Sequence, residues 1–288
     1  MEPATLNCEH DGLTLHARAL GDGPLVLCLH GYPDTAHTWD DLLPRLADAG
    51  YRAVAPFQRG YAPSTPAPDG DYSIEALGRD VVAWLDALGA EQADLIGHDW
   101  GTTAVLAATA LAPTRVRKLV TLAIPHPRAL VPTPKLLWGA RHFGVYALPI
   151  WPERLVPKAG FAHLRAIYKR WSPNWEPSPE EFAEVDACFS DPAALRAALG
   201  YYRAVMRGGL SPRGLRSQAL IRKRITVPSL AIAGGTDPVV GPGHFEAAAS
   251  AYDGPYEVVV APRSGHFPHR EEPQLVGDAI LRFLGSAP

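Results

Sequence analysis

The chain has 288 residues, a formal net charge of −3, 47% hydrophobic residues and 20% charged residues. A chain of this length can form one large domain with an insertion, and the composition is ordinary for a globular protein. The small negative charge gives no reason to expect a nucleic acid or an anionic membrane as a partner.

The cysteines and the first residues narrow the class further. Cys8, Cys28 and Cys188 are far apart and have no metal-ligand spacing, so we expect a reducing compartment and no metal site. The first residues lack a basic segment followed by an apolar run, and no apolar run in the chain reaches about 18 residues. We therefore expect a cytoplasmic protein without a signal peptide or a membrane span, either a monomer or a homodimer.

The first part of the chain alternates predicted strands and helices. Residues 6–10 and 13–17 alternate apolar and polar side chains around Asp11-Gly12, which predicts a hairpin. The continuous apolar run 25–29 predicts a buried strand. Further elements are expected in this order: a helix at 38–49, a strand at 51–55, a helix at 73–88, a strand at 93–96 followed by a helix, and a strand at 116–123. This alternation predicts a doubly wound, mostly parallel sheet.

The pattern changes between residues 126 and 225. This segment is rich in Trp, Tyr, Arg and Pro, and it contains helical patterns but no convincing strand. One of its predicted helices begins at Ser178 and another at Asp191, the second with one face formed by Leu195, Leu199, Tyr202 and Met206. Strands resume at 229–233 and 256–260, and a last helix is expected at 273–284. We therefore predict a core formed by residues 1–125 and 226–288, with residues 126–225 inserted as a helical lid.

The pentapeptide Gly97-His98-Asp99-Trp100-Gly101 joins a predicted strand to a predicted helix. Its two glycines lack a Cβ, so strand and helix can approach closely and the middle residue can adopt a strained backbone. This pattern is typical of a nucleophile elbow, which presents one side chain at the N-terminus of a helix. Here that side chain is Asp99, where an esterase or lipase has serine.

An aspartate at this bend has a different chemistry from a serine. A carboxyl group with a pKa of about 4 is ionised at neutral pH and needs no base to become a nucleophile. Its attack on a saturated carbon gives an alkyl ester that water can cleave, whereas serine would give a stable ether. Asp99 therefore indicates opening of a C–O or C–halogen bond at carbon. The alternative is an aspartate that only caps the helix.

Three further motifs follow predicted strands, at the edge where open α/β sheets place their sites. In His30-Gly31-Tyr32-Pro33, the backbone N–H of Tyr32 could form an oxyanion hole with that of Trp100. Asp237 and His266 follow the last two strands, and the order nucleophile, acid, histidine is that of this fold's triads. His266 would activate water and Asp237 would orient its imidazole. The alternatives are simple turns and a surface histidine.

Together these motifs resemble the epoxide hydrolase and haloalkane dehalogenase branch of the α/β-hydrolases. The resemblance rests on His30-Gly31-Tyr32-Pro33, Arg59-Gly60-Tyr61 with Ser64, Gly97-His98-Asp99-Trp100-Gly101 and Gly265-His266-Phe267-Pro268. It implies an α/β-hydrolase fold with a lid, and a cofactor-independent reaction in which the aspartate attacks carbon and the histidine–acid pair hydrolyses the ester. Phe57 departs from the pattern, since the family usually has an acidic residue two positions before the arginine.

The two substrate classes differ in what receives the leaving atom. Epoxide hydrolases resemble one another in using two lid tyrosines to protonate the opened ring, and Tyr202 in Tyr201-Tyr202-Arg203-Ala204 matches one of them. A phenol is a credible acid for an alkoxide, although Tyr202 could also simply pack. Either His142 or Tyr146 could take the second position. These two residues lie one helical turn apart.

Haloalkane dehalogenases instead bind the halide with two N–H donors. Trp100 could supply one, but the second donor is usually an Asn after His-Gly, where this chain has Tyr32. The arginines that would hold a haloacid after the nucleophile are replaced by Thr102 and Thr103. We therefore expect hydrolysis of a small apolar epoxide to a vicinal diol, with a haloalkane dehalogenase and a non-catalytic ligand-binding protein as alternatives.

The substrate contacts are expected on both sides of the site. From the core we expect contacts by Tyr32, Pro33, Trp100 and Phe267. The aromatic residues of the predicted lid suggest an apolar pocket, although they could also pack lid against core: Trp138, Phe143, Trp151, Phe161, Tyr168, Trp171 and Trp175.

Overall fold

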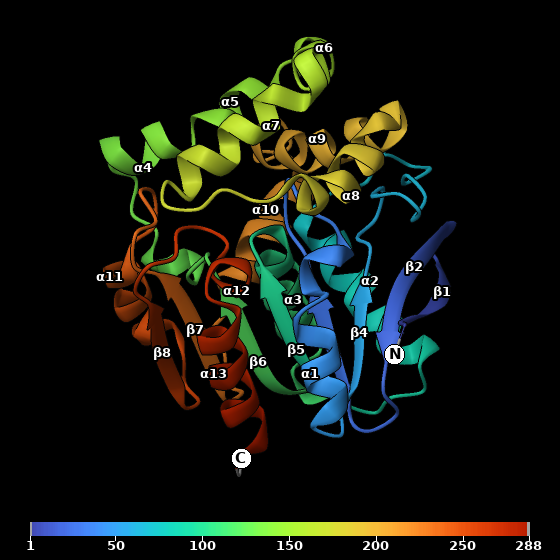
Figure 1. Cartoon of the computed structure of the whole chain (residues 1–288), viewed down its shortest axis with the longest axis vertical. Helices are drawn as coiled ribbons and strands as arrows, with labels where there is room; N and C mark the ends of the chain where they lie inside the picture. The colour runs from blue at the N-terminus through green and yellow to red at the C-terminus, as the bar shows by residue number, and fades with distance from the viewer. Residues whose placement is uncertain (1, 287–288) are drawn as a thin grey trace.

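Within residues 2–286, which the computed structural model describes, one eight-stranded sheet has the order β1-β2-β4-β3-β5-β6-β7-β8 (Figure 1). β1 pairs antiparallel with β2 and β2 antiparallel with β4, and the remaining neighbours are parallel. The strands are β1 (Ala4–His10), β2 (Leu13–Leu20), β3 (Leu25–Leu29), β4 (Arg52–Pro56), β5 (Ala93–His98), β6 (Val116–Leu122), β7 (Ser229–Gly234) and β8 (Tyr256–Ala261). The predicted hairpin and mostly parallel sheet are confirmed.

Helices cover both faces of the sheet, and the side chains of successive residues in a strand point to opposite faces. In β3, Leu25, Leu27 and Leu29 belong to the core on the side of α2 (Ile74–Ala87) and α3 (Trp100–Leu111). Val26 and Cys28 belong to the core on the side of α1 (Leu42–Asp48) and α13 (Pro273–Gly285). All five β3 side chains are buried, as their continuous apolar run predicts for a strand covered on both faces.

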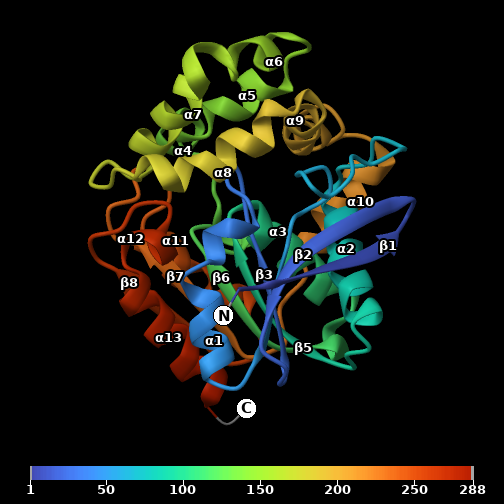
Figure 2. The same cartoon turned by 45° about the vertical axis from the view of Figure 1, so that its right-hand side comes forward.

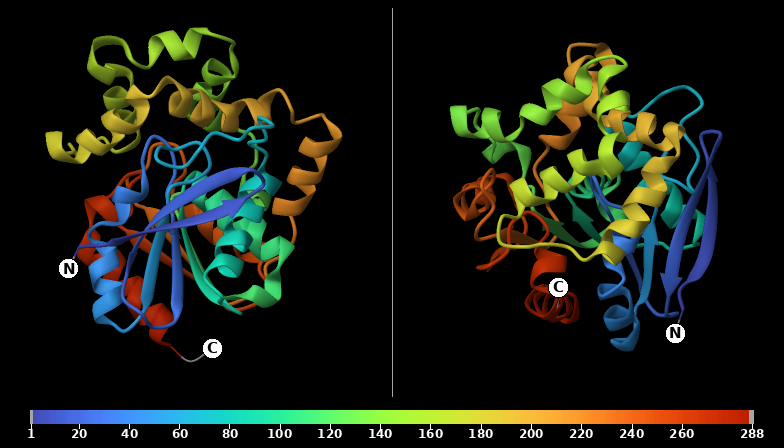
Figure 3. Two further views of the ribbon diagram at one scale, coloured as in Figure 1. Left: turned by 90° about the vertical axis from the view of Figure 1, so that its right-hand side faces the viewer. Right: turned by 45° about the horizontal axis from the view of Figure 1, so that its top comes forward.

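A layer of helices lies across the carboxyl ends of the parallel strands (Figures 1 and 2). It consists of α4 (Pro134–Gly139), α5 (Arg141–Ala147), α6 (Trp151–Leu155), α7 (Lys158–Trp171), α8 (Pro179–Ser190) and α9 (Pro192–Met206), with α10 (Pro212–Ile221) returning to the core beside α2. Figure 3 shows that the layer covers this end of the sheet only and leaves the opposite end uncovered. The core is completed by α11 (Pro242–Ala247), α12 (Pro268–Glu271) and four 3-10 turns, Ala36–Trp39, Pro113–Arg115, Pro127–Ala129 and Ala248–Ala251.

Two expectations about helices need correction. The helix predicted at 38–49 is a 3-10 turn, Ala36–Trp39, followed by the short helix α1. Pro44 lies in the first turn of α1, because a proline deeper inside a helix would clash with the preceding turn and remove a hydrogen bond. Met206 was expected on the buried face of α9, but it is the last residue of that helix and is 52% exposed.

No helix in residues 2–286 combines the length and the apolar character needed to cross a membrane.

Candidate active site

Asp99 lies at a sharp turn between β5 and α3. Its backbone has φ 53° and ψ −116°, a conformation that costs an ordinary residue about 1–3 kcal/mol. The turn depends on close backbone contacts, since a Cβ on Gly97 would overlap the carbonyl of Gly101, and a Cβ on Gly101 would overlap the carbonyl of Leu29. The structure thus has the strand, tight turn and helix that the glycines of this motif predict.

The carboxylate of Asp99 has two partners from other parts of the chain. The Tyr32 N–H donates a 2.8 Å hydrogen bond to its Oδ1, and His266 Nε2 lies 3.5 Å from its Oδ2. Gly31 makes this approach possible, because a Cβ there would overlap the Asp99 side chain. The N–H of Trp100 is the first of helix α3, so no carbonyl within that helix can accept from it. The Tyr32 N–H therefore contacts the Asp99 carboxylate, and the Trp100 N–H has no acceptor within its own helix.

His266 connects Asp99 to Asp237. Its Nδ1 lies 3.1 Å from Asp237 Oδ2, while Oδ1 of Asp237 accepts hydrogen bonds from the N–H groups of Val239 and Val240 at 2.7 and 3.0 Å. The side chains of Asp237 and His266 are buried, and that of Asp99 is 13% exposed. The structure therefore brings together the three residues that the sequence singled out, in the order carboxylate, imidazole, carboxylate.

The surroundings give the histidines of this region different charges. Burial opposes the positive charge of His266, but the hydrogen bonds and negative charges of Asp237 and Asp99 outweigh it and raise its pKa to about 9. Burial also opposes ionisation of Asp99, but His266 outweighs it and lowers the pKa of that carboxyl group. Burial lowers the pKa of His98 to about 4 and that of His142 to about 3. At neutral pH, Asp99 and His266 form an ion pair, and the two other imidazoles are uncharged.

A cavity of about 320 Å³ has Asp99 and His266 in its wall, and we call it the Asp99 cavity. Trp100 from α3, His142 and Phe143 from α5 and Trp171 from α7 also line it, and most of the other lining side chains are apolar. The cavity therefore lies between the carboxyl edge of the sheet and the helical layer. It can hold a small apolar molecule against the Asp99 carboxylate.

The three candidate proton donors occupy different places. His142 lines the Asp99 cavity. Tyr202 is buried with its ring against three residues of the cavity wall, Trp100, His142 and Phe143, at centroid distances of 5.2, 5.5 and 4.8 Å. Tyr146 is also buried, but its hydroxyl is hydrogen-bonded to the Tyr32 hydroxyl at 3.0 Å and to His163 Nε2 at 2.9 Å. His142 is therefore the better placed of the two alternatives.

Of the four expected substrate contacts, two lie at the site and two pack beside it. Trp100 lines the Asp99 cavity, and Tyr32 reaches Asp99 through its N–H. Phe267 is fully buried with its ring stacked on Tyr168 at 4.5 Å, and the Pro33 carbonyl accepts a hydrogen bond from the Tyr168 hydroxyl at 3.1 Å. These two residues therefore pack the helical layer onto the core beside the site.

The lid aromatics also separate into groups. Phe143 and Trp171 line the Asp99 cavity, and Tyr168 is buried against the core. Trp138 and Trp151 are 71% and 51% exposed and so contribute nothing to the cavity wall.

Two residues near His266 were not anticipated from the sequence. Glu271 accepts hydrogen bonds from the N–H groups of Gly265 and Phe267 at 2.8 and 3.0 Å and from the Ser172 hydroxyl at 2.6 Å. The Ser172 Oγ in turn accepts from the His266 N–H at 2.9 Å. This arrangement, which we call the Glu271 clamp, holds the backbone on both sides of His266. A glutamate five positions after a histidine carries no motif, so only the fold reveals it.

Residues 24–273 match the family described as alpha/beta hydrolase fold, and the chain belongs to that family. Its relatives place it in the epoxide hydrolase-like branch. It is 32% identical to epoxide hydrolase A of Mycobacterium tuberculosis over 308 residues, covering 95% of each chain. Among solved structures it is similar to epoxide hydrolase A from Mycobacterium thermoresistibile, with a TM-score of 0.83, 28% identity and 98% of each chain covered. An epoxide hydrolase from Vigna radiata superposes with a TM-score of 0.82 at 26% identity, again over 98% of each chain.

Proposed function

We propose that this protein is an enzyme that hydrolyses a small apolar epoxide to a vicinal diol through an alkyl ester on Asp99. The observation that carries the proposal is the meeting of the Asp99 carboxylate with the His266 imidazole, 3.5 Å apart, in the wall of an apolar cavity. The named activity of the relatives supports the same reaction.

In the first step, an oxygen of the ionised Asp99 attacks a ring carbon of the epoxide. A C–O bond of the ring breaks and its electron pair stays on the ring oxygen, which needs a proton. Burial, together with the charge of Asp99, raises the pKa of Tyr202 well above its usual value, so the phenol keeps its proton until an alkoxide forms. The neutral imidazole of His142 can donate a second hydrogen bond to the same oxygen.

In the second step, His266 takes a proton from water, and the resulting hydroxide attacks the carbonyl carbon of the Asp99 ester. In this proposal the negative oxygen of the tetrahedral intermediate accepts from the N–H groups of Tyr32 and Trp100. One such donor contributes about 3 kcal/mol to lowering the barrier. Collapse releases the diol, whose leaving oxygen takes the proton from His266, and leaves Asp99 as a carboxylic acid with one oxygen from water. Transfer of the proton of this acid to His266 restores the carboxylate and the ion pair of the free enzyme.

The order of the steps follows from the charges. While Asp99 is ionised, it helps to keep His266 protonated and unable to act as a base. Formation of the ester removes the charge of Asp99, so the pKa of His266 falls. The proton that His266 then releases replaces the one that Tyr202 gave to the ring oxygen, and His266 becomes a base where the reaction needs one. We also propose that residues 126–225 form the lid that separates this chemistry from bulk water.

The experiment uses styrene oxide and two variants. Asp99→Ala should lose all diol formation, because no other group can form the ester. His266→Gln should still be alkylated, so intact-protein mass spectrometry should show an added mass equal to that of styrene oxide. Normal diol formation by Asp99→Ala would exclude the proposal. Halide release from 1-chlorohexane by the wild-type protein, without diol from styrene oxide, would select the dehalogenase alternative.

A further inference from the structure

A second cavity, of about 330 Å³, adjoins the Asp99 cavity. Ile74, Val205 and Ile221 line both cavities. Ile74 is the first residue of α2, Val205 lies in the last turn of α9, and Ile221 is the last residue of α10. Three branched apolar side chains from three helices therefore form a common wall between the two cavities.

The second cavity opens to solvent on its far side. Gly70, Arg213 and Gln218 are part of its lining and are exposed. The exposed Arg213 on α10 reaches the buried Asp71 at 3.3 Å across the rim. The second cavity is therefore a polar-rimmed opening in the surface that ends at the apolar wall.

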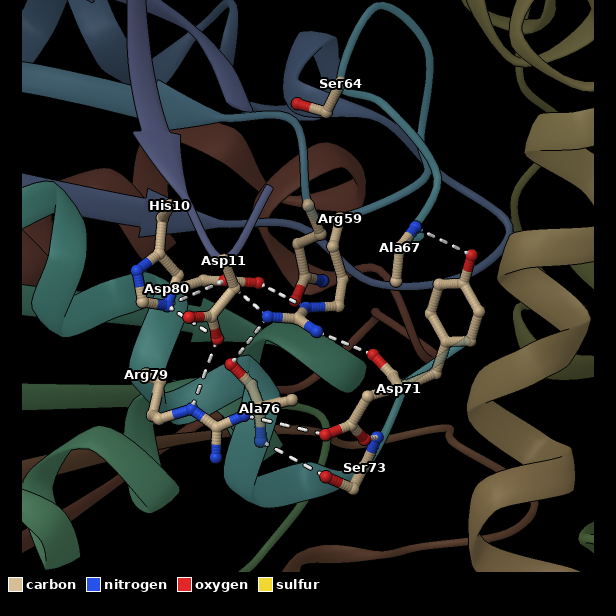
Figure 4. A network of polar contacts seen from close by, with 12 residues as sticks. His10, Asp11, Arg59, Ser64, Ala67, Asp71, Ser73, Ala76, Arg79 and Asp80 are labelled. Carbon is tan, nitrogen blue, oxygen red and sulfur yellow. Dashed lines mark hydrogen bonds and ion pairs between the residues drawn. The ribbon is translucent and has the colours of Figure 1, made fainter. Parts of the chain in front are cut away.

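A network of hydrogen bonds and ion pairs lies on the core side of this opening (Figure 4). Asp71 accepts a 2.9 Å hydrogen bond from the Ser73 N–H and lies 3.5 Å from Arg79. The buried Arg59 donates to the Asp71 carbonyl at 2.6 Å and to both carboxylate oxygens of Asp80 at 2.6 Å. This network holds residues 71–73, and with them the start of α2 and Ile74.

Helix α9 is also held firmly against the core. The Tyr201 hydroxyl donates to the Arg59 carbonyl at 2.9 Å, and Gly200 packs so closely on the Tyr72 ring that a Cβ would meet it at 3.0 Å or less. Val205 and Ile221 are nonetheless only half-buried, unlike Ile74. Because the backbone of α9 is held in place, rotation of the Val205 and Ile221 side chains is the motion that we expect to join the two cavities.

We propose that the second cavity is the passage between solvent and the Asp99 cavity, and that Ile74, Val205 and Ile221 are its gate. A slim apolar epoxide passes with small side-chain rotations, whereas a bulky substituent is delayed at Val205 and Ile221. That an epoxide uses this passage rests on the proposed function. The passage itself is inferred from the two cavities and their shared wall. The competing route is the α4 side of the Asp99 cavity, where the half-buried Leu136 is part of the wall.

The test measures access to the cavity without any catalysis. Thr103 lines the Asp99 cavity on α3, while Cys8, Cys28 and Cys188 are buried, so Thr103→Cys introduces a thiol that reports on entry. The reaction of this thiol with N-phenylmaleimide is followed by mass spectrometry. The wild-type protein, which lacks the Thr103→Cys substitution, is the labelling control. Three blocking variants are compared in this background: Ile221→Trp at the gate, Gln218→Trp in the second cavity alone, and Leu136→Trp on the α4 side. Thermal unfolding verifies that each variant folds.

Ile221→Trp and Gln218→Trp should each slow labelling about tenfold, because passage through a narrowed gate limits the rate. Val205→Ala should accelerate it, and Leu136→Trp should leave it within about twofold of the Thr103→Cys parent. The proposal is overturned if Leu136→Trp slows labelling while Gln218→Trp does not. Labelling that follows the gate in a protein that forms no diol would retain the passage and reject the proposed function.

Discussion

His266 differs from the other histidines of the site in the charge that its surroundings impose. Asp237 and Asp99 flank its imidazole at 3.1 and 3.5 Å and raise its pKa to about 9, whereas His98 and His142 have pKa values of about 4 and 3. The protonated His266 of the free enzyme becomes a base when the negative charge of Asp99 is removed. Formation of the ester on Asp99 removes that charge.

Asp99→Asn mimics that loss of charge. Removing a negative neighbour disfavours the imidazolium, so the pKa of His266 should fall below its value of about 9 in the wild type. Titration of the His266 Cε1 proton by NMR measures the change directly. An unchanged pKa in the variant would show that Asp99 does not control the protonation of His266.

The Glu271 clamp leads to a prediction about one step of the reaction. Glu271→Ala frees the backbone on both sides of His266, and a displacement of about 1 Å at a reacting group can cost about a hundredfold in rate. Ester hydrolysis should therefore slow by about tenfold to a hundredfold, while alkylation of Asp99, which does not need His266 as a base, should change little. Rapid-quench mass spectrometry of the alkylated protein separates the two rates.

The matched control for this experiment is Glu246→Ala, which removes an exposed glutamate from α11. It should leave both steps unchanged. Equal slowing of alkylation and hydrolysis by Glu271→Ala would mean that Glu271 supports the fold generally and does not position His266.

At the scale of the element, the turn between β5 and α3 depends on the absence of two side chains. Gly101→Ala places a methyl group against the Leu29 carbonyl and should lower the free energy of unfolding by about 3 kcal/mol or more, as strained or overpacked core substitutions do. Urea unfolding measures the loss. Gly144→Ala in α5 is the matched control, because its Cβ would meet nothing within 4 Å, and it should stabilise the helix by about 0.5–1 kcal/mol. Similar values for the two variants would contradict the close contact.

The elements that could be predicted from the sequence are those whose local chemistry is sufficient. The elbow has its two glycines, α8 begins with the predicted capping box at Ser178, and β3 has its apolar run. The helix expected at 38–49 instead begins at Leu42, because Pro44 is tolerated only in the first turn of a helix. The triad could be predicted because each member lies in the turn or loop that follows a strand of the parallel sheet.

The position of the second proton donor could not be predicted in the same way. His142 and Tyr146 are four residues apart on α5 and share a face of that helix, so periodicity cannot separate them. Their hydrogen-bond partners in the folded chain separate them, since the Tyr146 hydroxyl is hydrogen-bonded to Tyr32 and His163. The Glu271 clamp and the gate at Ile221 likewise depend on contacts between segments that are distant in sequence.

At the scale of the whole molecule, the site exists only because three parts of the chain meet. Asp99 and Tyr32 come from the first part of the core, Asp237 and His266 from the loops after β7 and β8, and His142 from the helical layer. Trp171, at the end of α7, lines the cavity and accepts a 3.1 Å hydrogen bond from the His266 N–H through its carbonyl. The helical layer therefore shapes the cavity and also contacts the base.

The central claim is that the oxygen added to the substrate comes from Asp99. The most direct measurement is a single turnover, with enzyme in excess over styrene oxide, in water enriched in oxygen-18. The account predicts an unlabelled diol and an oxygen-18 atom in the Asp99 carboxylate, detected by mass spectrometry of the peptide that contains it. An oxygen-18 atom in the diol, with Asp99 unlabelled, would show that water attacks the epoxide directly and would contradict the account.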